Sequence, residues 1–282
     1  MARAIQAPAG LIMQTILPES ALLGSIVGVV LGLTGAGGAI IAVPLLIFGL
    51  HLAIADAAPI ALLAVCISAA MGALLALKRG KVRYRAASLL ALTGLAASPL
   101  GVFLAQRIPD APLTLLFAMV MGYAAFHLFR QSMGNSAEDA GCSPAPCQLG
   151  PGGRLTWTWV CARRMTMAGV LTGFLSGLLG VGGGFIIVPA LQKVTDLHMQ
   201  SIMSTSLAVI ALVSLVGVIS AMLMRGMDWA IALPFAFGAG AGMLLVGAFA
   251  HRFTGQRLQQ GFAVVAGCVA IGMILRQVQN LL

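Results

Sequence analysis

Long apolar runs alternate with short polar segments along most of this chain. About 20 apolar residues are enough to cross the hydrocarbon core of a membrane, and a charge at its centre costs several kcal/mol. By this criterion the membrane runs are 20–50, 57–77, 86–106, 111–129, 165–192, 197–224, 229–252 up to its arginine, and 258–275. The pattern predicts an all-α polytopic membrane protein with about eight to ten membrane segments.

Two of these runs are interrupted by glycines. At about 1.5 Å per residue, the run 20–50 would measure roughly 46 Å as one helix, too long for one straight crossing and too short for two with a turn. A Gly-x-Gly-Gly motif lies near its middle at 35–38, and the run 165–192 has the same motif at 180–183. We therefore predict two short helical segments, joined at the glycines, in each run.

The two interrupted runs are copies of each other. Gly28, Gly32, the Gly-x-Gly-Gly motif and Pro44 all recur 145 positions later. A spacing kept over that many positions indicates two homologous halves. The expected domains are a first membrane repeat, a polar linker and a second membrane repeat, at 1–130, 131–164 and 165–282.

Charges between the runs indicate how the halves are oriented. The loop 78–85 is strongly basic and its counterpart 225–228 is neutral, whereas one loop later the bias reverses between 106–110 and 252–257. Basic loops stay on the cytoplasmic side, so equivalent loops would lie on opposite sides of the membrane, as in inverted repeats. A parallel arrangement with four crossings per half is the alternative.

Composition narrows the class of protein further. Hydrophobic residues make up 60% of the chain and charged residues 8%, and the mean hydropathy is +1.03, which excludes an ordinary soluble domain. The net charge of +9 does not indicate nucleic-acid binding, because five of the 16 basic residues lie in the loop 78–85 and no basic helix with interleaved aromatics accompanies them. Residues 1–18 hold one basic residue and no cleavage site, which argues against a cleaved signal peptide.

The glycines have two interpretations. Gly24, Gly28 and Gly32 are spaced four apart, as are Gly173 and Gly177, and this spacing lets membrane helices pack closely. The Gly-x-Gly-Gly motifs need a different explanation, because unpaired backbone groups at membrane depth are tolerated only inside the protein or against a cavity. Short Gly/Pro-interrupted segments at matching positions of two halves indicate the binding site of a transporter.

Such a site favours an anion. Two helix breaks that face each other would direct unpaired N–H groups and positive helix ends at one point, and nearby hydroxyls would add hydrogen bonds without charge. The runs contribute no fixed acid that would coordinate a cation. The candidate substrate-binding residues are Thr34, Gly35, Gly37, Gly38, Pro44, Gly180, Gly182, Gly183, Gly184, Pro189, Ser204, Thr205 and Ser206.

Ionisable residues near the breaks are candidates for gating or proton coupling. They are His51, Asp56, Lys193, Asp196 and His198. The alternative is that these residues simply end the spans at the water interface.

Other motifs are absent or incomplete. The dinucleotide motif Gly-x-Gly-x-x-Gly fails because Ile40 and Phe185 occupy its last position, and no Gly-Lys-Ser/Thr sequence occurs. The histidines and acids have no metal-ligand spacing, so we predict no metal, no cofactor and no enzyme activity. Three cysteines, Cys142, Cys147 and Cys161, could form a thiol relay or metal clip, but their spacing favours reduced cysteines in a cytoplasmic loop.

The duplicated pattern Gly-x-Gly-Gly-[Gly/Ala]-x-Ile-x-Val-Pro, followed at 204–209 by Ser-Thr-Ser-Leu-Ala-Val, resembles the sulfite exporter TauE/SafE family of bacterial membrane permeases. The resemblance extends from about residue 20 to residue 277. It implies a multi-pass protein of the bacterial inner membrane that moves sulfur-containing anions, usually as a secondary transporter. The sequence departs from the pattern at Ala39, where the second half has Gly184, and the first half lacks the Ser-Thr-Ser motif.

These features predict a secondary transporter of sulfite, thiosulfate or an organosulfonate that works by alternating access between its two halves. A membrane redox or assembly factor that uses the linker cysteines is one alternative, and a passive anion channel is another. The expected partners are the small anionic substrate and the lipid bilayer, without nucleic acid, and a homodimer is left open.

Overall fold

The structure is a computed structural model that describes residues 9–35, 38–78, 84–132, 159–194, 199–224, 226–249 and 256–281. The helices of the first half are α1 (Ala9–Thr34), α2 (Gly38–Gly49), α3 (Ile54–Lys78), α4 (Tyr84–Ala105) and α5 (Asp110–Ser132). Those of the second half are α6 (Trp159–Leu179), α7 (Gly184–Val194), α8 (Met199–Met224), α9 (Trp229–Phe249) and α10 (Gln256–Leu281). The predicted all-α fold is confirmed, and both predicted breaks interrupt helices where the glycines occur.

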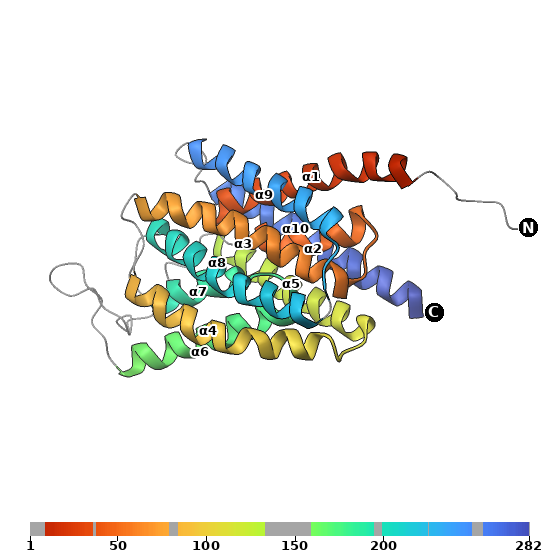
Figure 1. Ribbon diagram of the computed structural model, residues 1–282. Helices are drawn as coiled ribbons and strands as arrows, with labels where there is room; N and C mark the ends of the chain where they lie inside the picture. The colour runs from red at the N-terminus through yellow and green to blue at the C-terminus, as the bar shows by residue number, and fades with distance from the viewer. Residues whose placement is uncertain are drawn as a thin grey trace, which may run out of the picture.

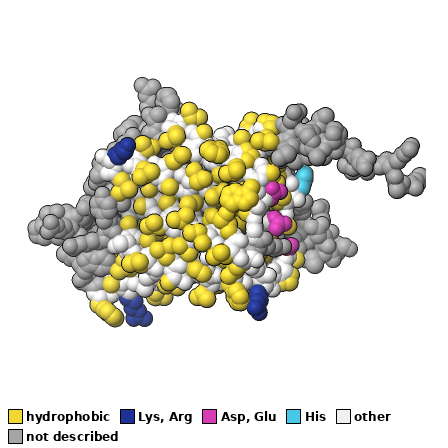
Figure 2. Space-filling model, viewed as in Figure 1, with side chains coloured by type: hydrophobic (Ala, Val, Ile, Leu, Met, Phe, Trp, Pro, Cys, Tyr) yellow, Lys and Arg dark blue, Asp and Glu magenta, His cyan; other side chains and the backbone are white. Residues whose placement is uncertain are grey.

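The outer surface of this bundle is suited to lipid. Large apolar side chains such as Leu74 and Phe237 are exposed, and Figure 2 shows apolar atoms across the middle of the molecule, with charged atoms toward its ends. Within the described residues, five helices contain segments long and apolar enough to cross a membrane: Leu17–Thr34, Ile54–Lys78, Ala86–Ala105, Ser201–Met224 and Trp229–Val246. The chain is therefore a multi-pass membrane protein.

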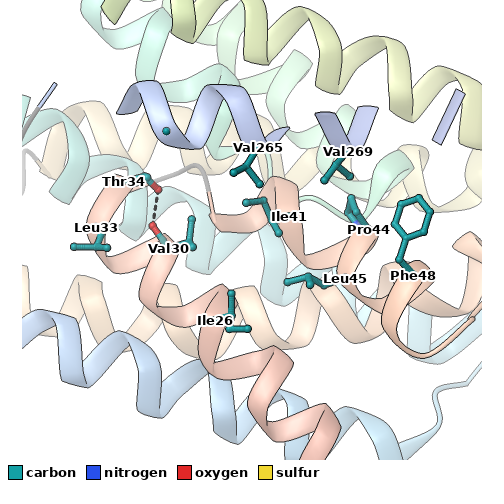
Figure 3. Close-up of a pocket in the computed structure, with 11 residues that line it drawn as sticks. Ile26, Val30, Leu33, Thr34, Ile41, Pro44, Leu45, Phe48, Val265 and Val269 are labelled. Carbon is teal, nitrogen blue, oxygen red and sulfur yellow. Dashed lines mark hydrogen bonds between the residues drawn. The ribbon is translucent and has the colours of Figure 1, made fainter. Parts of the chain in front are cut away.

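The first glycine break reverses the direction of the chain. Gly38, at the start of α2, lies against Leu31 of α1, and Phe48 near the end of α2 shares a groove with Ile26 of α1. α2 therefore folds back along α1, as Figure 3 shows. The two segments differ in length. α1 is longer than predicted and contains a complete span, Leu17–Thr34, whereas α2 has only 12 residues.

The two halves are interlocked rather than placed side by side. The most extensive packing joins α1 to α9 and α4 to α6, while α3 packs on α8 and α5 on α10, so each pair takes one helix from each half (Figure 1). Gly28 of α1 faces the backbone of Ala239 on α9, and Gly173 of α6 faces the backbone of Gly94 on α4. The predicted packing role of the glycines spaced four apart is confirmed.

The helix directions in Figure 1 are also informative. α1 begins and α10 ends at one end of the bundle, whereas α5 ends and α6 begins at the other end. Each group of five helices therefore finishes at the end opposite to where it started.

Candidate functional site

The second break, between α6 and α7, is fully buried and depends on left-handed glycines. Gly182 and Gly183 have φ angles of +70° and +67°, a region that residues with side chains rarely adopt. A Cβ atom on Gly182 would lie 2.7 Å from Val65 and 3.0 Å from the hydroxyl oxygen of Ser214. Glycine alone meets both the conformational and the spatial requirement here.

This break leaves backbone donors available. α6 ends with the N–H of Gly180 donating to the Ser176 carbonyl at 2.9 Å, and α7 begins with the N–H of Ile186 donating to the Gly183 carbonyl at 3.1 Å. Within the described residues, no hydrogen bond uses the N–H groups of residues 182–184. Free amides at the first turn of a helix provide partial positive charge and hydrogen-bond donors for an anion.

The first break, between α1 and α2, is closed by α8. Gly35, with a φ angle of +72°, ends α1 through a 2.8 Å hydrogen bond from its N–H to the Leu31 carbonyl. The single hydroxyl proton of Ser206 is shared between the Met203 carbonyl at 2.8 Å and the Gly35 carbonyl at 3.3 Å. α8 therefore holds this break in place from the opposite half of the chain.

The two breaks come close together in the interior. Ile40, at the start of α2, lines the same small cavity as Leu179 and Val181 of the second break, with α5 on the other side. A Cβ atom on Gly180 would lie 2.5 Å from the side chain of Ala58, so the second break contacts α3 of the first half. The second break thus lies against α3 of the first half, and the first break lies against α8 of the second half.

The predicted hydroxyl donors near the first break are already engaged. Thr34 donates to the Val30 carbonyl at 2.7 Å, the bond drawn in Figure 3, and Thr205 donates to the Ser201 carbonyl at 2.6 Å. Ser204 is half-buried, and it is not without a bonding partner either. The hydrogen bonds of Thr34 and Thr205 hold these side chains against the helix backbone. A substrate could bind the two hydroxyls only by replacing those hydrogen bonds.

The remaining predicted glycines and prolines divide between the two breaks. Gly38 and Gly184 are buried at the first positions of α2 and α7, whereas Gly37 lies outside the described residues. Pro44 and Pro189 lie inside these two short helices, and Pro44 faces the groove in Figure 3.

The predicted gating residues that the structure describes lie away from the buried breaks. His51, with a φ angle of +53°, is exposed in the turn after α2, and Asp56 is exposed in the first turn of α3. Lys193 belongs to α7, but its side chain lies outside the description, as do Asp196 and His198 entirely. A gating role for these five residues stays a prediction.

Sequence reasoning missed three serines near the second break. Ser98 on α4, Ser176 on α6 and Ser214 on α8 are fully buried, and in the described part of the chain their hydroxyls have no hydrogen-bond partner. Buried hydroxyls almost always find a partner, because leaving one unpaired costs about 1–3 kcal/mol. A position-by-position comparison of the two halves shows that these positions are polar in one half only, but it does not show what the serines contact.

A larger groove of about 560 Å³ lies outside the first break, between α1, α2 and α10 (Figure 3). Its side chains are apolar except for Thr34, whose hydroxyl is bonded to α1. The groove therefore offers no free side-chain donor to an anion and is not the candidate site.

The cysteines do not form a metal site in the region that the structure describes, where no cluster of three or more His, Cys, Asp or Glu residues is found. Cys161 is buried at the start of α6 and takes part in a disulfide, so the expectation of a reduced thiol is wrong for this residue. Cys142 and Cys147 lie outside the described residues.

A helical bundle that crosses the membrane several times and holds two glycine-broken hairpins in its interior has the construction of a membrane transport protein. The chain belongs to the sulfite exporter TauE/SafE family, whose model matches residues 20–273.

Several relatives cover most of the chain. A probable membrane transporter protein of Xylella fastidiosa is 31% identical over 260 residues, which are 90% of this chain and 93% of the relative. A probable membrane transporter protein of Methanocaldococcus jannaschii is 26% identical over 73% of this chain and 72% of its own length. Another from Bacillus subtilis is 26% identical over 78% of this chain and 84% of its own length. No solved structure matches the chain.

Proposed function

We propose that this protein is a secondary transporter of a small sulfur-containing anion, such as sulfite, thiosulfate or an organosulfonate, across the bacterial inner membrane. The observation that best supports the proposal is the buried break before α7, where the amides of residues 182–184 have no backbone partner among the described residues. Donors of this kind are suited to an oxyanion. The sulfur chemistry comes from the description of the family.

Alternating access is the mechanism that suits this geometry. The described residues of both breaks are buried, and Ile40 next to the first break lines the same small cavity as Val181 of the second. A buried site is reached from either side only if helices move around it, which is how transporters with broken helices work. A passive channel would instead need a continuous polar path, and the buried polar side chains described here are a few serine and threonine hydroxyls in an otherwise apolar interior.

The charges at the two ends suggest the orientation in the membrane. Exposed basic side chains lie at the end of α3, the end of α5 and the start of α6, and exposed acidic side chains lie mainly at the opposite end (Figure 2). The positive-inside rule then makes the first of these ends cytoplasmic. The basic residues are Lys78, Arg130, Arg163 and Arg164, and the opposite end has Glu19, Asp56, Asp110, Asp228 and Arg107.

Replacing Gly183 by valine tests the proposal. Valine would be strained at a φ angle of +67°, and its Cβ would overlap Thr172 of α6, so the amides of the break would move. We expect sulfite uptake into vesicles to fall at least about tenfold, since a displacement of about 1 Å at a site can cost far more than that.

The matched control is Gly272→Val on α10, where a Cβ would meet nothing within 4 Å. Both variants should insert into the membrane and purify as the wild type does. Sulfite uptake that is the same in Gly183→Val and Gly272→Val would contradict the proposal.

The disulfide of Cys161 is the one observation that favours the alternative of a redox or assembly factor. That alternative requires the cysteine for activity, whereas the transport proposal places no cysteine at the breaks. Sulfite uptake by a variant with Cys142, Cys147 and Cys161 replaced by serine separates the two functions.

A further inference from the structure

The two breaks are equivalent in sequence, but their surroundings differ. Three buried serines that have no hydrogen-bond partner within the described residues, Ser98, Ser176 and Ser214, lie on the helices packed next to the second break. The equivalent positions, 145 residues away, are occupied by buried apolar residues, namely Met243, Leu31 and Ala69. The three serine positions in the helices next to the second break are therefore apolar in the helices next to the first.

Ser214 lies directly at the second break, and Ser98 and Ser176 lie on the two helices, α4 and α6, that pack together before it. The hydroxyl oxygen of Ser214 on α8 lies 3.0 Å from the point where a Cβ of Gly182 would be. The hydroxyl oxygen of Ser98 on α4 lies 3.3 Å from the equivalent point at Gly217, one turn further along α8. The backbone of Ser98 also faces Gly177 on α6, in the last turns of the helix before the break. α4, α6 and α8 thus enclose one polar region.

In the described part of the first break, the nearby hydroxyl on α8 is already bonded. This hydroxyl, that of Ser206, donates to the Gly35 carbonyl. The residue equivalent to Ser206 in the first half is Ala61, so no such bond closes the second break. One break is therefore locked by an internal hydrogen bond, and the other has donors without acceptors.

We propose that the anion binds only at the second break, held by the hydroxyls of Ser98, Ser176 and Ser214 and by the amides of residues 182–184, and that the first break is structural. This proposal rests on the transport function proposed above and assigns its binding site. The ligand class is a small sulfur oxyanion with several acceptor oxygens, such as sulfite or the sulfonate group. The donors are all neutral, because the buried polar side chains that the structure describes are all serine or threonine hydroxyls. Helix amides and hydroxyls can hold an anion without a charged partner.

A narrow cavity of about 30 Å³ leads toward this region. Leu62, Val102 and Gly177 line it beside Ser98, and it also touches Gln106 at the end of α4. That volume holds about one or two water molecules, so the path is too small for a sulfite ion in this conformation. The helices around it must separate for the ion to enter from the end of the bundle that bears Asp110.

The test measures anion affinity and thermal stability on the same purified full-length variants. Sodium sulfite and sodium methanesulfonate are the probes, and sodium chloride is the reference salt. We expect Ser98→Ala and Ser214→Ala each to weaken the affinity for sulfite about tenfold or more, because each removes a hydrogen bond to a charged group. The melting temperature without ligand should stay the same or rise, because each variant also removes an unpaired buried hydroxyl.

Ser68→Ala is the matched control. Ser68 is equally buried on α3, but its hydroxyl donates to the Ala64 carbonyl at 2.8 Å. This variant should melt at a lower temperature and keep the affinity of the wild type for sulfite.

Each other outcome overturns a defined part of the account. If the wild type binds sulfite and both site variants bind it equally well, the serine site is wrong and the transport proposal stands. If the site variants lose affinity together with stability, the serines are structural and the assignment also fails. If the wild type binds neither probe, the transport proposal fails for sulfite and organosulfonates, together with the site.

Discussion

At the scale of single residues, glycine has two separate functions in this protein. Gly182 and Gly183 adopt a backbone conformation that opens a helix end in the interior. Gly28 and Gly173 instead let the backbones of neighbouring helices touch. Both kinds of glycine occur within one repeated stretch, but a side chain would disturb them in different ways, by strain in the first case and by overpacking in the second.

Gly28→Leu should prevent stable folding. A Cβ at this position would overlap the carbonyl of Ala239 on α9, so the rest of a leucine side chain would force α1 and α9 apart. The cost should reach or exceed about 3 kcal/mol, the upper part of the range for overpacking. Size-exclusion chromatography of the detergent-extracted protein measures the loss.

Gly272→Leu on α10 is the control for this substitution, because a Cβ there meets nothing within 4 Å. It should leave the yield of monodisperse protein unchanged. Equal yields for Gly28→Leu and Gly272→Leu would show that the α1/α9 contact does not hold the halves together.

The glycines could be identified from sequence because their spacing repeats, whereas the serines could not. Ser98, Ser176 and Ser214 are single polar residues in different apolar helices, and serine is common in membrane helices as a residue bonded to its own backbone. Their importance depends on the packing of α4, α6 and α8 next to one break, which the sequence does not reveal. The Ser204-Thr205-Ser206 motif was conspicuous in the sequence, but Thr205 and Ser206 donate to backbone carbonyls.

At the scale of elements, the apolar runs predicted the helices well because the membrane imposes both a length and a composition on them. The breaks after Thr34 and Leu179 follow from the glycines. The reversal of α2 along α1 could not be predicted, since run length gives no direction after a break. The run also appeared to start at Ser20, but α1 begins at Ala9, because Pro18 and Glu19 are accommodated within the helix.

The directions of α3 and α8 test the inverted-repeat prediction. In Figure 1 these helices run in opposite senses, since α3 ends and α8 begins at the same end of the bundle. A reporter inserted after Lys81 and another inserted after Gly226 should therefore lie on opposite sides of the membrane, with the first in the cytoplasm. Activity of both reporters on one side would favour the parallel arrangement.

At the scale of the whole molecule, the interlocking of the halves limits how transport can work. Two sequence halves that moved as rigid bodies would have to separate α1 from α9 and α4 from α6, where the helices pack through glycines. We therefore expect the moving units to combine helices from both halves. In that case α1 and α9 stay together, α4 and α6 stay together, and the contact of α3 with α8 at the centre changes.

If the anion binds at the second break, its position predicts which helices stay together and which move. The site lies among α4, α6 and α8, so an anion there would strengthen the contacts within that group. The other group, with α1 and α9, would move relative to it. Such a carrier exposes one buried site alternately to the two sides, whereas a channel opens a continuous path.

Counterflow in liposomes containing the purified wild-type protein tests whether sulfite crosses through one site that opens to each side in turn. Liposomes are loaded with unlabelled sulfite and diluted into a trace of radiolabelled sulfite, with no membrane potential. A carrier with one alternating site predicts that labelled sulfite accumulates transiently inside, above its equilibrium level, and that external methanesulfonate or thiosulfate reduces this accumulation when either is a substrate. Entry of the label without a transient excess, or no entry beyond that of empty liposomes, would contradict the account.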